Sequence, residues 1–342
     1  MAHSATPILA IAVIAALAGC AQSSAAPRQD GVRIVATTDV YGSIATTIGG
    51  DAVSVTSLIE GPASDPHSYE ANVQDQLAVS KAQIVISNGG GYDPFIESLL
   101  EASKTGAVQI VASEASGLLD GSAADPHGDE DPHGDEHATE EDPHAEEEHG
   151  GEGDDVTKEI RDNHAHIEGF NEHVWYDFHA VESIAAEIEH ELAEIDPDNA
   201  EEFAANLADF TTKIEGLEEL ATVLRAETAG KGVAITEPVP SYLLAEVGLD
   251  NRTPEEFSEA IEEGTDVSPT VLRDTLAALD SDSLAIVAYN SQTASAETEK
   301  LRAEAESRGI PVVEFTETLP DDADYVSWMT ANLEAISAAL EK

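Results

Sequence analysis

The sequence predicts an α/β fold of two lobes with parallel sheets, joined by one long backbone helix. In both halves of the chain, short apolar runs typical of buried strands alternate with segments of helical periodicity, and this alternation favours parallel sheets. Between the halves, apolar residues recur at helical spacing over residues 197–228. At a rise of about 1.5 Å per residue such a helix extends roughly 45 Å, so it can cross a whole domain.

The first half combines strand-like runs with short helical segments. We expect strands at Arg33–Thr37, Val53–Ile59, Ile84–Ser87 and Val108–Ala112, and helices at Val40–Ile48, Asn72–Lys81, Tyr92–Leu100 and Ala180–Ile195. An acidic segment over residues 120–166 interrupts this half, and the α/β pattern resumes at Asn171–Asp177. We therefore assign residues 31–196, with that segment included, to an N-terminal lobe.

The second half repeats the same alternation of elements. We expect strands at Val233–Thr236, Leu284–Tyr289 and Pro311–Phe315, and helices at Tyr242–Val247, Pro269–Leu279, Ala294–Ser307 and Tyr325–Leu340. The acidic stretch Thr253–Thr265 shows little apolar periodicity and predicts irregular structure. Residues 229–342 should form a C-terminal lobe.

The N-terminus predicts export. The apolar run Ile8–Gly19 is too short to span a bilayer but fits the core of a signal peptide, although no Lys or Arg precedes it. Cys20, the only cysteine, follows Leu-Ala-Gly, a pattern that resembles a bacterial lipobox. We expect residues 1–19 to be a signal peptide, Cys20 to be lipidated, and residues 20–30 to be a tether.

The segment 120–166 contains a repeated Asp-Pro-His motif. DPHGDE occurs at residues 125–130 and again at 131–136, and DPHAEE follows at 142–147. So little apolar surface predicts a mobile loop. Imidazole and carboxylate suit zinc, so we interpret the segment as an accessory metal loop; a solvated acidic linker is the alternative. Its histidines are His127, His133, His137, His144, His149, His164 and His166.

Charge limits the partners of this chain. The net charge is −54, from 69 acidic and 15 basic residues, and acids dominate outside the His-rich segment as well. Nucleic acid and anionic membrane surfaces are therefore poor partners, and we expect no nucleic-acid binding, whereas cations are attracted. Adaptation to high salt is an alternative cause of this acidity. With one cysteine, no disulfide can form within the chain.

Four polar residues lie where a metal site is expected. In open α/β sheets, ligands bind beyond the carboxyl ends of the strands. Three candidates follow predicted strands, and the fourth lies where the chain re-enters the first lobe. Because each half of the chain supplies two of the four candidates, we expect the site to lie between the lobes. Glu314 is an alternative to Glu317. The candidates are His67, His173, Glu237 and Glu317.

Several motifs carry a resemblance to a known family. They are Asp-Pro-His-x-Tyr-Glu at 65–70, His-x-Trp at 173–175, Thr-Glu-Pro at 236–238 and Tyr-Leu-Leu from 242. Together with the lipobox, the His-rich insertion and the joining helix, they resemble the zinc/manganese cluster of substrate-binding lipoproteins of ABC importers. The resemblance covers Val32 to Lys342.

This resemblance implies both a site and a role. His67, His173, Glu237 and Glu317 would hold one divalent ion between the lobes, and no residue would be catalytic. The chain would be a monomer, anchored by lipid to the extracytoplasmic face of the bacterial cell membrane. Its partners would be an ABC permease and the ATPase of that permease. The ion would be cargo, and no catalytic cofactor is implied.

The chain departs from the family pattern at three positions. Glu172 stands where proline usually precedes the second histidine, and Glu237 stands where zinc members often have histidine and manganese members have glutamate. Glu317-Thr-Leu replaces Asp-Pro-Leu. Two imidazoles and two carboxylates can hold zinc, whereas oxygen ligands also suit manganese. The His-rich segment favours Zn²⁺ over Mn²⁺ as cargo, because imidazole-rich capture prefers zinc.

Other functions have weaker support in the sequence. A manganese receptor of the same family is one alternative, and a surface zinc buffer or adhesin without a transporter is another. A zinc hydrolase should show a signature such as His-Glu-x-x-His or a nucleophile elbow, and neither pattern occurs. We therefore expect a metal-binding receptor and no enzyme.

Overall fold

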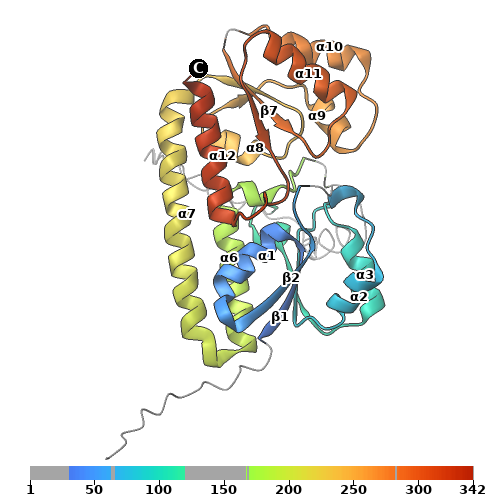
Figure 1. Ribbon diagram of the computed structural model, residues 1–342, viewed down its shortest axis with the longest axis vertical. Helices are drawn as coiled ribbons and strands as arrows, with labels where there is room; N and C mark the ends of the chain where they lie inside the picture. Colours follow the sequence, from blue (N-terminus) through green and yellow to red (C-terminus); the bar gives the residue numbers. More distant parts are fainter. Residues whose placement is uncertain (1–30, 63–65, 120–166, 168, 282, 342) are drawn as a thin grey trace, which may run out of the picture.

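Two separate four-stranded parallel sheets form the centres of the two lobes in the computed structural model (Figure 1). The structure describes residues 31–62, 66–119, 167, 169–281 and 283–341. The predicted signal peptide, Cys20, the tether and the seven histidines of the segment 120–166 lie outside these ranges. Within them, the predicted fold class of two parallel α/β lobes and a long helix is confirmed.

All strand pairs in both sheets are parallel. The N-terminal sheet has the order β2-β1-β3-β4, and the C-terminal sheet has the order β6-β5-β7-β8. Helices cover the sheets, so central strands such as β3 and β5 are buried at every position, as expected for parallel sheets. The strands are β1 Val32–Thr38, β2 Val53–Ile59, β3 Ile84–Ser87, β4 Val108–Val111, β5 Gly232–Ile235, β6 Asp250–Asn251, β7 Leu284–Asn290 and β8 Val312–Phe315.

The helices match most of the predicted segments. The α-helices are α1 Asp39–Gly49, α2 Val73–Val79, α3 Phe95–Ser103, α4 Ala112–Ala115, α6 Phe178–Ile195, α7 Ala200–Thr228, α8 Ser241–Glu246, α9 Glu255–Glu262, α10 Pro269–Ala278, α11 Ala296–Ser307 and α12 Tyr325–Leu340. Short 3₁₀ turns occur at η1 Gly50–Ala52, η2 Pro66–Ser68, η3 Val174–Tyr176 and η4 Pro197–Asn199. The helix expected over 197–228 is thus a 3₁₀ turn followed by α7.

Helix α7 is the element that runs along both lobes (Figure 1). It has 29 residues, and it lies beside α1 and α6 in its first part and beside α12 further on. One apolar stripe attaches it to the core, because Phe203, Phe210, Ile214, Leu217, Ala221 and Leu224 are all buried. Burial of such a stripe stabilises a helix more than its intrinsic propensity does.

Buried aromatic side chains bridge the lobes behind the candidate site. The Tyr325 hydroxyl donates to the Trp175 carbonyl at 2.7 Å, and the Tyr176 hydroxyl donates to the Thr316 carbonyl at 2.7 Å. Trp328 packs edge-on against Tyr176, with ring centroids 5.3 Å apart. These contacts tie the segment that carries His173 to the loop that carries Glu317.

The prediction of irregular structure for Thr253–Thr265 was wrong, because this stretch contains α9. Phe257 and Ile261 lie one helical turn apart, and both are buried against β5, β7 and α11 residues of the C-terminal lobe. The stretch contains only these two large apolar residues among many acids, so its sequence shows too little apolar periodicity to predict a helix. The two-residue strand β6 was also missed, since both of its residues are exposed.

Candidate metal centre

His67 lies in the turn η2, in the loop that follows β2. The loop is attached to the first residue of α1, because the Gly61 backbone N–H donates to Asp39 Oδ2 at 2.7 Å. The imidazole packs edge-on against Tyr92, with ring centroids 4.8 Å apart. His67 therefore has a defined position within reach of both lobes.

His173 directly precedes η3 and is almost completely buried. Asn171 Oδ1 accepts the His173 backbone N–H at 3.1 Å and lies 2.7 Å from Nδ1 of the ring. A hydrogen bond from Nδ1–H to that carbonyl selects the tautomer in which Nε2 carries the lone pair. Metal-binding histidines in proteins are commonly oriented in this way by a partner on the other ring nitrogen.

Glu317 comes from the C-terminal lobe, in the loop after β8, and is 1% exposed. Its Oε2 lies 3.6 Å from His67 Nε2 and accepts the Tyr92 hydroxyl at 3.2 Å. Its backbone N–H donates to Gln292 Oε1 at 2.6 Å. Ligand atoms of His67, His173 and Glu317 all lie within 4.8 Å of one another, so these three residues can hold one ion.

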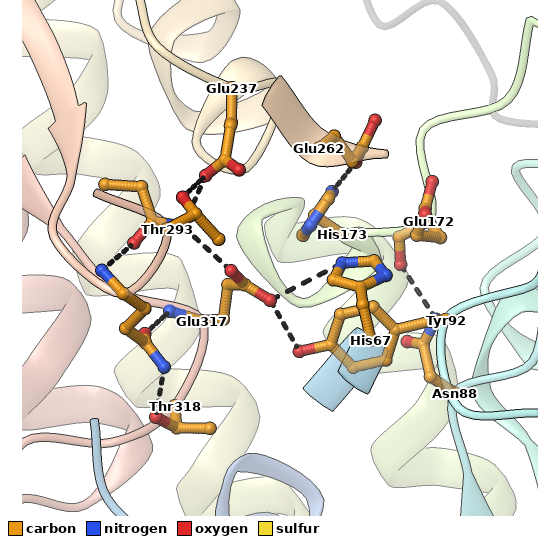
Figure 2. Close-up of polar contacts among 12 residues, drawn as sticks. His67, Asn88, Tyr92, Glu172, His173, Glu237, Glu262, Thr293, Glu317 and Thr318 are labelled. Carbon is orange, nitrogen blue, oxygen red and sulfur yellow. Dashed lines mark hydrogen bonds and ion pairs between the residues drawn. The ribbon is translucent and has the colours of Figure 1, made fainter. Parts of the chain in front are cut away.

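Glu237 lies beside this group, shortly after β5, but is not part of the set within 4.8 Å. Its Oε2 accepts hydrogen bonds from Asn290 Nδ2 and Thr293 Oγ1, each at 2.5 Å. The same Asn290 nitrogen donates to Glu317 Oε1 at 2.8 Å. One amide therefore holds the carboxylates of Glu237 and Glu317, which Figure 2 labels, next to each other.

Glu314, the alternative to Glu317, points elsewhere. Its side chain is 57% exposed, and its Oε1 lies 3.7 Å from Arg302 Nη2. It belongs to β8, whereas Glu317 comes after the strand has ended. The geometry therefore brings Glu317, and not Glu314, to the two histidines.

Two further acids that were not predicted as ligands lie in the same place (Figure 2). Ligand atoms of His67, Glu172 and Glu262 also lie within 4.8 Å of one another, and Glu262 Oε1 is 3.7 Å from His173 Nδ1. Glu172 had one signal in the sequence, since it replaces the usual proline. Glu262 had none, because it is one of many acids in a stretch expected to be irregular.

Burial and like charge act strongly on this group of acids. Burial, and then the neighbouring Glu172, Glu237 and Glu317 carboxylates, raise the pKa of Glu262 to about 9. Glu262 therefore retains a proton at neutral pH in the metal-free protein. Burial and Glu317 also raise the pKa of Tyr92 well above its ordinary value, which keeps its hydroxyl a donor. A bound cation reverses the cost of ionising such carboxylates.

Two α/β lobes joined by a long helix, with imidazoles and carboxylates gathered between them, define a substrate-binding protein of the metal-receptor class. The family model for ZnuA, described as the periplasmic component A of a zinc-uptake complex, matches residues 34–339. The chain belongs to this family. Its members bind a cargo rather than catalyse a reaction.

Two relatives of similar sequence are named for manganese. A manganese-binding lipoprotein MntA from Halalkalibacterium halodurans is 26% identical over 62% of this chain, and the match spans 56% of that relative. The manganese ABC transporter substrate-binding lipoprotein PsaA from Streptococcus anginosus is 23% identical over 98% of this chain and 97% of its own length.

A solved structure shares the fold. The periplasmic zinc-binding protein TroA from Treponema pallidum superposes with a TM-score of 0.65 at 18% identity, covering 91% of this chain and 99% of that one.

Across the part of this chain that the structure describes, no helix combines the length and apolar character needed to cross a membrane.

Proposed function

We propose that this chain is a lipid-anchored receptor that binds zinc outside the bacterial cell membrane and delivers it to an ABC permease and its ATPase. The observation that carries the proposal is the group of His67, His173 and Glu317, which combines residues of both lobes. Glu237, held beside Glu317 by Asn290, is proposed as the fourth ligand. Two imidazoles and two carboxylates match the ligands that zinc takes.

The anchor and the location rest on the sequence and on the relatives. Cys20 after Leu-Ala-Gly supplies the lipidation site, and two of the relatives are named as lipoproteins. The receptor is proposed to act as a monomer on the extracytoplasmic face of the cell membrane. Residues 120–166 are proposed to gather zinc locally through their seven histidines.

Competitive titration of the exported protein with zinc and manganese tests this proposal. We expect one tightly bound zinc per chain, with affinity reduced about 100-fold or more in His67→Ala and His173→Ala, because each substitution removes a ligand. A variant lacking residues 125–153 should keep this tight site. Absence of tight binding in the natural chain, or its loss with the deletion alone, contradicts the cleft site.

Manganese is the second candidate cargo, because the site contains more carboxylates than the proposed set needs. Glu172 and Glu262 lie within reach of His67. Oxygen ligands suit manganese, and two relatives are named for that metal. The same titration distinguishes the candidates: tighter binding of manganese than of zinc would reassign the cargo.

A further inference from the structure

His67 belongs to two different groups of possible ligands. In the first, which we call the imidazole set, it stands with His173 and Glu317; in the second, the carboxylate set, it stands with Glu172 and Glu262. Within each set the ligand atoms lie within 4.8 Å of one another. Each set takes residues from both lobes, so an ion held by either would join the lobes.

A hydrogen bond to the backbone carbonyl of Glu172 holds this residue in the N-terminal lobe. Asn88 Nδ2 donates to the Glu172 carbonyl at 3.0 Å, and the Tyr41 hydroxyl donates to Asn88 Oδ1 in the buried core. Gly90 approaches closely from the other side, since a Cβ there would lie 3.3 Å from the Cβ of Glu172. Glu172 itself is 2% exposed, so its carboxylate is directed inward by a rigid surround.

In the C-terminal lobe, the position of Glu262 is set by the end of a helix. Glu262 is the last residue of α9, and its neighbour Ile261 is buried in the core of that lobe. Phe257, one turn earlier, is completely buried and anchors the same helix. The Glu262 side chain is 11% exposed and faces His173 across the cleft. The helix therefore delivers a carboxylate to the site without help from a flexible loop.

The two sets differ in chemical character. The imidazole set has two nitrogen ligands and one carboxylate, whereas the carboxylate set has one nitrogen ligand and two carboxylates. Imidazole suits zinc, and carboxylate together with water suits manganese. A neutral imidazole has a single lone pair, so His67 can bind one ion at a time. The sets are therefore alternative positions rather than two independent sites.

We infer that the cleft offers one divalent ion two positions: the imidazole set for zinc, and the carboxylate set, through Glu172 and Glu262, for a harder cation such as manganese. This inference rests on the proposed function as a metal receptor. It gives each kind of ion its own set of ligands within a single cleft. It also assigns a role to Glu172, the residue that replaces the proline of the family motif.

The test compares the two metals in matched variants of the exported chain. Manganese binding is followed by loss of the electron paramagnetic resonance signal of the free ion, and zinc binding by competition with a chromophoric chelator. The variants are Glu172→Gln, Glu262→Gln, the double variant and His173→Ala. Glu256→Gln is the control, because it makes the same substitution at an exposed acid of the same helix.

We expect the double variant to lose about 10- to 100-fold in manganese affinity, while its zinc affinity changes less than about threefold. His173→Ala should show the opposite pattern, and Glu256→Gln should match the natural chain. Zinc should displace manganese completely from the tight site, with one tightly bound ion in total. Thermal unfolding of each metal-free variant confirms that it is folded, and the single variants replace the double variant if that protein unfolds.

The outcomes separate the two proposals. If the natural chain binds neither metal tightly, the proposed function fails. If it binds metal but Glu172→Gln and Glu262→Gln change zinc and manganese affinity equally, or leave both unchanged, only the two-position inference fails. Simultaneous binding of one zinc and one manganese would also overturn it. A loss in Glu256→Gln as large as in Glu262→Gln would reduce the effect to general electrostatics and overturn it too.

Discussion

Asp39 in the N-terminal lobe accepts the backbone N–H of Leu319 in the C-terminal lobe, with a distance of 3.0 Å from Oδ1 to the nitrogen. Its second oxygen accepts the Gly61 N–H at 2.7 Å. Gly61 begins the loop that leads to His67, and Leu319 lies two residues after Glu317. One carboxylate at the start of α1 thus holds the two loops that carry a proposed ligand from each lobe.

Asp39→Ala should therefore weaken both stability and metal binding. Two partly buried backbone donors lose their acceptor, which should cost about 1 kcal/mol in the free energy of unfolding. We expect a decrease in zinc affinity of about tenfold, because the loops lose their relative position. Denaturant unfolding and zinc competition measure the two effects. Asp51→Ala, at an exposed acid after α1, is the control and should change neither.

Asn290 should contribute to metal affinity although it is not a proposed ligand, because its amide nitrogen donates to both Glu237 and Glu317. Asn290→Ala removes both bonds and leaves two carboxylates free to separate. Thr293→Val removes only the hydroxyl bond to Glu237. We expect Asn290→Ala to lower zinc affinity about 10- to 100-fold and Thr293→Val to lower it less. Equal affinities in both variants would contradict the bridging role.

Tyr92 contributes to the site through both its hydroxyl and its ring. The hydroxyl donates to Glu317 Oε2 at 3.2 Å, and the ring packs against His67. Tyr92→Phe removes only the hydrogen bond, so zinc affinity should fall severalfold at most. Tyr92→Leu also removes the aromatic wall and should reduce affinity further. Isothermal titration of both variants checks the order; identical effects would exclude a role for the ring.

Binding of manganese by the carboxylate set should release a proton from Glu262. Burial and neighbouring acids raise the pKa of Glu262 from 4.5 to about 9 in the metal-free protein, so the group is protonated at neutral pH. A divalent cation favours the carboxylate, hence affinity should increase with pH up to about 9. Titration calorimetry in buffers of different ionisation enthalpy counts the protons released. Glu262→Gln should release fewer than the natural chain.

The same shift affects the stability of the metal-free protein. A carboxyl group with a raised pKa stabilises the folded state fully below its unfolded value, near 4.5, and this contribution is lost as the pH rises towards 9. Between these values, Glu262→Gln should make unfolding less dependent on pH. An unchanged pH profile of the unfolding midpoint in this variant would contradict protonation of Glu262 in the folded protein.

The strands and the joining helix of this protein could be predicted from the sequence by itself. Apolar runs such as those of β3 and β5 predicted buried parallel strands, and the apolar stripe from Phe203 to Leu224 predicted the joining helix. The motifs around residues 65–70 and 173–175 drew attention to His67 and His173. These features depend on periodicity and on short motifs, which neighbouring residues alone specify.

Only the tertiary structure revealed that Glu172 and Glu262 also meet these histidines, whereas Glu237 and Glu317 were predicted from the sequence. Glu262 lies far from His67 in the sequence, and α9 forms because Phe257 and Ile261 find a core in the C-terminal lobe. Glu172 and Glu262 therefore join His67 only when the lobes are in place, and Asn290 draws Glu237 towards Glu317 in the same way. In so acidic a chain, composition cannot single out these few carboxylates; contacts between lobes select them.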